Sequence, residues 1–486
     1  MPNPYISVVV AARNDDHGGN MLARMGAFAG SWIQQAEALG LASELIVVEW
    51  NPVPGCRSLA DAIPWPKKHE HCRIRFITVP PERHALFPHP ESIPLHQMIA
   101  KNVGLRRADG EFVLATNLDI VFSAELMQFL ASRRLNRAEM YRIDRYDVDR
   151  NIPAGWSVDG LLEHCAGRLL RVHTREGDFE IDNYGNRKLQ AADVVTEGTG
   201  ILFGKGWYPP ESYGGEKFRW MQPFAEVIFR RPGGKLPRLF IDLEAGPSAG
   251  GPLRLDAASQ DGRTLATATI EGRCRIALAI PAEIESARIY LRVAGGNVPL
   301  GTDLRFLNLR VFSLEWAPRM WGREAATWQF EVCGAKRSVD WATTPQAPTP
   351  FAHDMTNAAY LHTNGCGDFT LMSRESWFAL RGYAEIPIWP MHIDSLLCYS
   401  AHHAGIREAI LNDPLRIYHI EHPSGAGWTP EGEQERTARV ASKKVPALRN
   451  EDVVELVTKM RRLNTPIIFN LENWGLCNEA LTERKL

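Results

Sequence analysis

The sequence predicts an α/β fold that is interrupted by a separate all-β segment, and three observations carry this prediction. Short β-branched runs alternate with amphipathic helical patterns through the first third of the 486-residue chain, as is typical of a mostly parallel sheet covered on both faces. From Gly206 to about Trp316 the helical periodicity gives way to short alternating runs between glycine and proline clusters. Mixed α/β character then returns.

The first third supplies four expected strands with helices between them. The strands are expected at Tyr5–Ala11, Leu45–Val48, Arg73–Val79 and Glu111–Thr116. Helical patterns cover Asn20–Leu39 and Ser92–Ala108, and a further helix is expected to begin after Ser123 as its N-cap. Ligands of such sheets gather at the carboxyl ends of the strands, so the residues that follow each strand are the first functional candidates.

The middle segment is expected to form an antiparallel β-sandwich. Its runs include Leu239–Leu243, Arg275–Ile280, Ala287–Val293 and Leu307–Phe312. We therefore expect a first half over residues 1–205, an inserted sandwich over 206–318, and a second half over 319–486 that ends in a helical extension. Thr343–Thr349 is interpreted as a linker back to the first domain.

Charge and composition exclude several classes of protein. Lys and Arg number 55 against 57 Asp and Glu, for a net charge of −2, so nothing indicates a nucleic-acid partner. The chain has neither the run of about 18 apolar residues that a spanning helix needs nor a signal-peptide pattern. The eight cysteines lack metal-ligand spacing. We expect a cytoplasmic protein without a transmembrane segment, and a peripheral membrane contact stays open.

Two acidic motifs could hold a cation in the first domain. Asn117-Leu118-Asp119 directly follows an expected strand, where a carboxylate can hold a divalent cation, although most such Asp residues only cap or turn the chain. Asp147-Val148-Asp149 lies in a dense charge run, which is typical of solvated or internally paired residues. Asp119 is therefore preferred.

Further residues join Asp119 in a resemblance to a known family. They are Ala12, Arg13 and Asn14 after the first strand, Glu49 after the second, Asn102-x-Gly104, and Asn117. With them, Tyr5–Phe122 resembles the donor half of a GT-A (Rossmann-like, nucleotide-diphospho-sugar transferase) glycosyltransferase of the family 2 type. The resemblance implies that these residues contact a nucleotide sugar and that Asp119 holds Mn²⁺ or Mg²⁺. The family has an aspartate where this chain has Asn117, which removes one charge from the cation site.

A second segment, His362–Glu385, reads as strand, turn and helix and precedes His392-Ile393-Asp394. It resembles the acceptor-side segment of inverting GT-A enzymes, in particular the galactosyltransferases, and only Asp394 of their acidic pair is present. The resemblance implies that Asp394 is the general base that takes the proton of the acceptor hydroxyl. The alternative, which is compatible, is that Asp394 caps a helix over Ser395–Ala404.

Two histidines near the C-terminal end of the resemblance could complete the cation site. They lie in Pro414–His422, where strand alternation places His422 and His419 on opposite faces. Imidazole is a suitable ligand for Mn²⁺, and many GT-A enzymes supply a C-terminal histidine. We expect one of the two to join Asp119, with His422 preferred. The glycine-rich loop Gly425–Trp428 that follows is either a lid or a surface turn.

These residues together predict a metal-dependent transfer of a sugar from a nucleotide-sugar donor, with a UDP-sugar preferred, to a saccharide or glycoconjugate hydroxyl with inversion. Three alternatives stay open: a retaining glycosyltransferase, a nucleotidyltransferase, and a catalytically silent carbohydrate-binding protein.

Overall fold

The computed structural model describes residues 3–153, 155–182, 187–190, 192–196, 198–230, 238–259, 264–279, 286–317, 326–329, 360–422, 438 and 441–486. The chain divides into unit 1, Met1–Arg175 with Leu361–Leu486, and unit 2, Glu176–Tyr360. These bounds differ from the boundaries expected after residues 205 and 318. The second expected boundary and the expected linker at Thr343–Thr349 lie outside the described residues.

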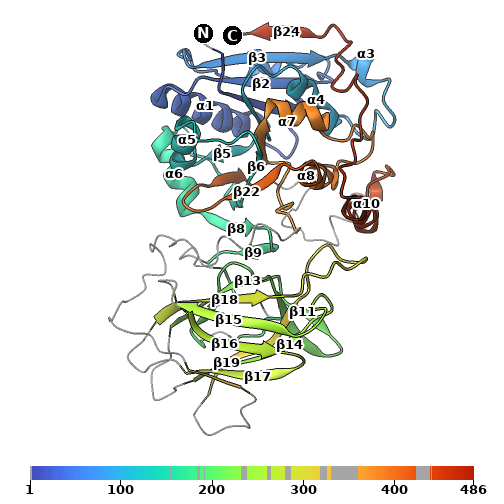
Figure 1. Ribbon diagram of the computed structural model, residues 1–486. Coiled ribbons are helices and arrows are strands. Elements are labelled where there is room, and N and C mark those ends of the chain that lie inside the picture. Colours follow the sequence, from blue (N-terminus) through green and yellow to red (C-terminus); the bar gives the residue numbers. More distant parts are fainter. Residues whose placement is uncertain are drawn as a thin grey trace. The chain divides into compact units, whose positions relative to one another are not determined.

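Unit 1 contains a mixed eight-stranded sheet (Figure 1). In spatial order its strands are β22 (Arg407–Leu411), β6 (Glu139–Ile143), β21 (Phe369–Ser373), β4 (Phe112–Thr116), β1 (Ile6–Ala12), β2 (Ser43–Trp50), β3 (Cys72–Val79) and β24 (Thr482–Lys485). The four strands from β4 to β3 are parallel, as are β22 and β6. β21 is antiparallel to both of its neighbours, and β24 is antiparallel to β3.

A smaller sheet of unit 1 lies beyond the end of β4. The strands of this sheet that belong to unit 1 have the order β5 (Ile120–Phe122), β23 (Ile417–Ile420), β7 (Arg145–Val148) and β8 (Leu169–His173). The helices of the unit are α1 (Met21–Leu39), α2 (Leu59–Ala62), α3 (Pro81–His84), α4 (Gln97–Arg106), α5 (Ala124–Ala131), α6 (Val158–Gly167), α7 (Arg374–Leu380), α8 (Ile393–His403) and α10 (Asn450–Leu463).

Helices cover both faces of the parallel part of the large sheet. The apolar face of α1 packs with Val8 and Val10 of β1 in one core. On the other face α4 lies against β1 and β2, and a Cβ atom at Gly104 would come within 2.5 Å of Val9 Cγ1 and 3.1 Å of Val48 Cγ2. Gly104 therefore allows the close approach of α4 to the strands whose ends carry the candidate residues.

Replacing Gly104 by alanine is expected to destabilise the protein by about 1–3 kcal/mol, because the stiff valine side chains of two central strands cannot move away. Urea unfolding measures this free energy. Gly26→Ala in α1 is the matched control, since a Cβ atom there meets nothing within 4 Å and alanine favours the helix by up to about 1 kcal/mol. Equal effects of the two substitutions would contradict this account of the packing.

Unit 2 is a β-sandwich, as the alternating runs of its sequence predict. After β9 (Asp178–Glu180), one sheet has the order β10 (Ile201–Phe203), β13 (Phe224–Arg230), β18 (Ser286–Ala294), β15 (Leu253–Ser259) and β16 (Thr264–Ile270). The other has the order β11 (Glu211–Tyr213), β12 (Glu216–Met221), β19 (Leu309–Ala317), β14 (Arg238–Ala245), β17 (Cys274–Ala279) and β20 (Ala326–Gln329). Buried aliphatic side chains from both sheets form one core.

The predicted fold class, an α/β GT-A (Rossmann-like) domain around a sandwich, is wrong for this chain. Strands in four sheets make up most of the described regular structure, and most of the described helices are short. A Rossmann-like class rests on an essentially parallel sheet of βαβ units, whereas β21 enters the large sheet antiparallel between β4 and β6. Only the sandwich part of the prediction is confirmed.

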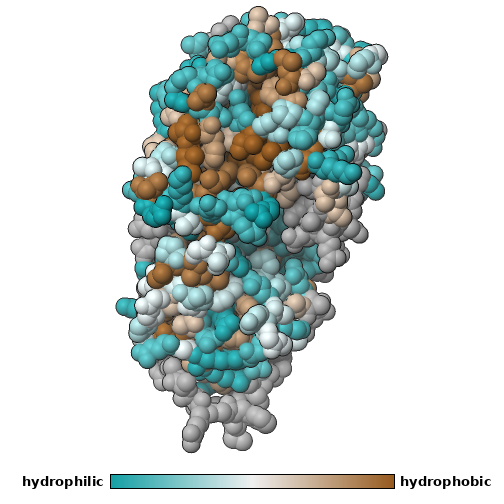
Figure 2. Space-filling view, turned by 90° about the vertical axis from the view of Figure 1, so that its right-hand side faces the viewer, coloured by the Kyte–Doolittle hydropathy of each residue, from teal (hydrophilic) through white to brown (hydrophobic). Residues whose placement is uncertain are grey.

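The surface mixes polar and apolar side chains. Figure 2 shows hydrophobic side chains gathered on one face of unit 1 among hydrophilic ones. The large hydrophobic side chains of unit 1 with the greatest exposure are Leu86, Leu463 and Leu471. None of the described helices combines the length and the apolar character needed to cross a membrane.

Candidate metal site

Strand pairing brings Asp119 and His419 together. Asp119 lies in the turn between β4 and β5. β5 is antiparallel to β23, and the register places His419 opposite Ile120. The carbonyl oxygen of Asp119 accepts a hydrogen bond of 3.0 Å from the backbone N–H of Ile420. The local backbone therefore fixes the carboxylate of Asp119 beside the imidazole of His419.

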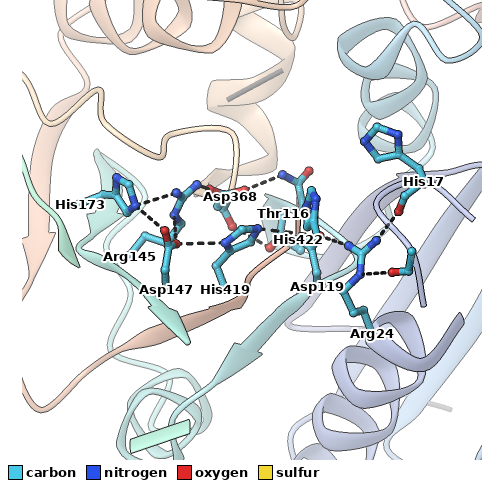
Figure 3. A network of polar contacts seen from close by, with 12 residues as sticks. His17, Arg24, Thr116, Asp119, Arg145, Asp147, His173, Asp368, His419 and His422 are labelled. Atoms are coloured by element: carbon cyan, nitrogen blue, oxygen red, sulfur yellow. Dashed lines mark hydrogen bonds and ion pairs between the residues drawn. The ribbon is translucent and has the colours of Figure 1, made fainter. Parts of the chain in front are cut away.

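His422 completes a group that we call the Asp–His cluster (Asp119, His419 and His422). One ligand atom of each residue lies within 4.8 Å of the others. The Nε2 atom of His422 is 3.1 Å from Asp119 Oδ2, and the Nε2 atom of His419 is 3.9 Å from the same oxygen. All three side chains are buried or nearly so, and Figure 3 shows them lying beside one another.

Both predicted histidines reach Asp119, although alternation places them on opposite faces of a strand. The physical reason is that β23 ends at Ile420, so His422 lies beyond the strand and strict alternation no longer holds. The ring of His422 lies against Gly18, where a Cβ atom would come within 2.8 Å of Nδ1. The backbone φ of Gly18 is +76°, a conformation that favours glycine.

The carboxylate of Asp119 is strongly held in its charged form. Burial alone would raise its pKa, but the hydrogen bond with His422 and the neighbouring positive charges hold the pKa well below its usual value. Arg24 of α1 is the fixed cation among these neighbours, with its Nη1 atom 2.7 Å from Asp119 Oδ2. Among the described atoms, Asp119 Oδ1 is buried and has no hydrogen-bond partner.

The residues present fit a divalent cation. Ligand atoms that share one ion at bond lengths of about 2.0–2.2 Å lie roughly 3 to 3.5 Å apart. The Nε2 atoms of His422 and His419 lie 3.1 Å and 3.9 Å from Asp119 Oδ2, so only small shifts of the side chains would bring the cluster to this spacing. Carboxylate oxygen and imidazole nitrogen are suitable donors for Mn²⁺, and Asp119 Oδ1 is the unpartnered donor. The guanidinium of Arg24 lowers the affinity of the cluster for a cation, because its positive charge already neutralises the single carboxylate.

A wider network of buried polar residues extends from the cluster (Figure 3). Asp147 Oδ1 lies 3.0 Å from His419 Nδ1. Arg145 binds Asp147 through Nε at 3.0 Å and Asp368 through Nη1 at 2.6 Å. Asp368 in turn accepts a hydrogen bond of 2.5 Å from Asn117 Nδ2. Asp147 and Arg145 of the charge run are therefore paired inside unit 1, as one of the two interpretations of that run expected, while Arg150 at its end is exposed.

The stability of the protein is expected to fall in acid because of Asp368. Burial raises its pKa, but the charges of Arg145 and His419 and the hydrogen bond from Arg145 together outweigh burial and hold the pKa below its usual value. A carboxyl group whose pKa is lower in the folded state stabilises the folded protein fully at pH values above its pKa in the unfolded chain, about 3.9. This stabilisation is lost as the pH falls below that value. Urea unfolding between pH 7 and pH 3 measures this loss. In Asp368→Asn, the free energy of unfolding at pH 7 should be about 1–3 kcal/mol lower than in the wild type. It should also decrease less between pH 7 and pH 3. An unchanged pH dependence would show that Asp368 does not cause the loss of stability in acid.

The residues expected to contact a nucleoside lie at the ends of β1 and β2, outside the Asp–His cluster. Ala12 ends β1 and pairs in register with Glu49. Arg13 Nε donates to the carbonyl of Asn51 at 2.8 Å, and Asn14 Nδ2 donates to the carbonyl of Arg57 at 2.8 Å. Asn14 and Arg13 therefore hold neighbouring loops in the structure.

Glu49 is buried at the end of β2. Its Oε1 atom accepts a hydrogen bond of 3.0 Å from the backbone N–H of Leu59, the first residue of α2. Burial raises the pKa of Glu49, against the lowering effect of this hydrogen bond. The described contacts of Glu49 thus hold the start of α2.

Asn102 and Asn117 differ in their positions. Asn102 is fully buried and makes hydrogen bonds with the backbone of Tyr383 in both directions at 2.8 Å, so it fixes the Gly382–Tyr383 turn. Asn117 is half-buried and accepts a hydrogen bond of 2.9 Å from Gln97. Through Asp368 only Asn117 belongs to the network around the cluster.

Asp394 lies in the first turn of α8 and is half-buried. The helix begins at Ile393, with His392 as N-cap in a left-handed conformation, so the expected capping of Ser395–Ala404 by Asp394 is wrong. Asp394 Oδ2 lies against the backbone at Gly367, where a Cβ atom would be 3.0 Å away. Burial lowers the pKa of the neighbouring Lys101 to about 8, although several carboxylates including Asp394 and Asp119 act to raise it.

Sequence reasoning missed the buried charges that support the cluster. The sequence does contain an indication that Arg24 is buried, because this charged residue interrupts an otherwise apolar helix face between Met21 and Phe28. Asp147 and Arg145 carried a weaker one, since they alternate on a strand within a charge run. Nothing in the local pattern indicated Asp368, whose role depends on contacts far along the chain.

Comparison with known proteins gives a partial likeness. No family model and no curated protein matches the chain. Similar solved structures include a mutant of a family 29 carbohydrate-binding module, with 16% identity over 24% of this chain and 81% of that one at a TM-score of 0.17. Another is a family 27 carbohydrate-binding module that recognises mannan, with 14% identity over 25% of this chain and 85% of that one at a TM-score of 0.16.

A third similar structure is the M60 catalytic domain of Clostridium perfringens ZmpB with its two family 51 carbohydrate-binding modules. It has 11% identity over 29% of this chain and 18% of that one, at a TM-score of 0.17. None of these three structures is a GT-A glycosyltransferase. Likenesses with such low TM-scores carry no inference about activity.

Proposed function

We propose that the protein acts on a saccharide-containing ligand and that unit 1 holds a divalent cation, Mn²⁺ or Mg²⁺, at the Asp–His cluster. The single observation that supports the cation is the convergence of the three ligand atoms within 4.8 Å. The buried, unpartnered Oδ1 of Asp119 adds to this support, because a buried charged oxygen is costly unless it has a partner.

The activity that this site suits best is the transfer of a sugar from a nucleotide-sugar donor, with a UDP-sugar preferred, to a saccharide or glycoconjugate hydroxyl. A bound cation would neutralise the departing diphosphate. Asp394 would take the proton from the acceptor hydroxyl. It is half-buried in the first turn of α8, and its Oδ2 atom lies against the backbone at Gly367.

Released nucleoside diphosphate tests this proposal. Purified protein with Mn²⁺ is screened against a panel of nucleotide sugars and short saccharides, and we expect release that depends on both donor and metal. Release of pyrophosphate would favour a nucleotidyltransferase. The anomeric coupling in proton NMR of a product would separate inversion from retention.

A carbohydrate-binding protein without catalysis is the second candidate, and two observations favour it. Arg24 already forms an ion pair of 2.7 Å with Asp119, while Asn117 and His392 stand where the resemblance would have acidic residues. Calorimetry separates the two candidates. Binding of UDP that requires Mn²⁺ supports glycosyl transfer, whereas binding of saccharides without any metal-dependent binding of UDP supports the second candidate.

A further inference from the structure

Asp147 is the centre of the buried network beside the Asp–His cluster. Its side chain is about 1% exposed, and it lies on β7 between β23 and β8. The parallel register of β7 and β23 sets Asp147 directly beside His419. Its carboxylate lies 3.0 Å from His419 Nδ1, 2.8 Å from His173 Nε2, 3.0 Å from Arg145 Nε and 3.1 Å from Arg171 Nη1.

The contact between Asp147 and His419 decides which nitrogen of His419 faces the cluster. A carboxylate accepts and does not donate, so Nδ1 of His419 must carry a hydrogen to bind Asp147. In the neutral ring the lone pair then belongs to Nε2, the atom that lies 3.9 Å from Asp119 Oδ2. Histidines that bind metals are commonly oriented by such a carboxylate on the second nitrogen.

We propose that Asp147 is a positioning residue for the cation of the Asp–His cluster, acting through His419. This inference rests on the proposed function, because it needs a cation at that place. Asp147 does not itself touch the cation. It fixes the ring orientation and the tautomer of His419.

A purely structural role for Asp147 explains the network less well. Each of its two arginines has a second carboxylate: Arg145 binds Asp368 at 2.6 Å, and Arg171 binds Glu421. Among the described residues, His419 Nδ1 has only Asp147 as a hydrogen-bond partner. Loss of the carboxylate would therefore leave both arginines paired and His419 without orientation.

The test is the affinity for Mn²⁺ alone, measured by electron paramagnetic resonance on the full chain. We expect Asp147→Asn to weaken binding about 10- to 100-fold. Asp144→Asn is the matched control, because Asp144 forms an equivalent pair with His362, 3.0 Å apart, that is not part of the cluster. Its affinity should equal that of the wild type.

A double variant separates positioning from general damage. Because Asp147 acts through His419, Asp147→Asn should weaken binding no further in a His419→Ala background. Two outcomes overturn this inference alone, provided that the wild type binds Mn²⁺. One is an unchanged affinity in Asp147→Asn, and the other is that Asp147→Asn weakens binding as much in the His419→Ala background as in the wild type. Absence of Mn²⁺ binding to the wild type overturns the proposed cation and this inference together.

A measurement on the wild type keeps the inference testable if Asp147→Asn does not fold. Nitrogen-15 NMR of the histidine rings, at a pH where they are neutral, reports which nitrogen carries the hydrogen. We expect hydrogen on Nδ1 of His419. Hydrogen on Nε2 would contradict the proposed orientation.

Discussion

Replacing Asp119 by asparagine is expected to reduce the affinity for Mn²⁺ about 100-fold or more. The substitution removes the only carboxylate of the Asp–His cluster, and charge count among the ligands sets the strength of such sites. It also leaves Arg24, whose Nη1 lies 2.7 Å from this carboxylate, as an unpaired cation that repels the metal. Titration with Mn²⁺ followed by electron paramagnetic resonance measures the effect.

Asp149→Asn is the control for this prediction. It makes the same change of charge in the neighbouring Asp147-Val148-Asp149 motif, and Asp149 accepts a local hydrogen bond of 2.7 Å from the backbone of Asn151. We expect it to bind Mn²⁺ as the wild type does. Retained affinity in Asp119→Asn, or its loss in Asp149→Asn, would place the cation at a different site.

The second large effect is expected at Asp394. Asp394→Asn should lower the rate of sugar transfer about 10²- to 10⁴-fold, the usual contribution of a general base, while the affinities for Mn²⁺ and UDP stay unchanged. The amide keeps the size of the side chain and still accepts the 3.0 Å hydrogen bond from the Ser395 N–H. Initial rates of nucleoside diphosphate release at saturating donor measure the loss.

Asp452→Asn provides a matched control, because Asp452 also lies in the first turn of a helix but is paired with Arg449 on the surface. Its transfer rate should equal that of the wild type. Full transfer activity in Asp394→Asn would show that Asp394 is not the base. A loss of Mn²⁺ affinity in the same variant would instead make Asp394 part of the cation site.

The members of the Asp–His cluster could be predicted because their signals are local. Asp119 follows a strand, and His419 and His422 lie within one short segment, so the sequence alone places a carboxylate and imidazoles near strand ends. Their convergence depends on the pairing of β5 with β23. A strand pairing between distant segments cannot be read from local periodicity.

The rest of the network could not be predicted for the same physical reason. The composition of the charge run around Asp147 fits a solvated surface and internal pairing equally well, and the contacts of Asp147 with Arg171 and His419 come from other strands. Likewise β21 enters the large sheet from the C-terminal part of the chain and alters its class. The sandwich could be predicted from the sequence, because the alternation of apolar and polar residues with period two, with turn residues between the runs, is typical of two facing sheets.

Diffraction from crystals soaked with Mn²⁺, recorded at the manganese absorption edge, would locate the cation in unit 1. We expect an anomalous peak bonded to a carboxylate oxygen of Asp119 and to the Nε2 atoms of His419 and His422. A peak bonded to other residues, or no peak at a saturating concentration of Mn²⁺, would show that the Asp–His cluster is not a metal site.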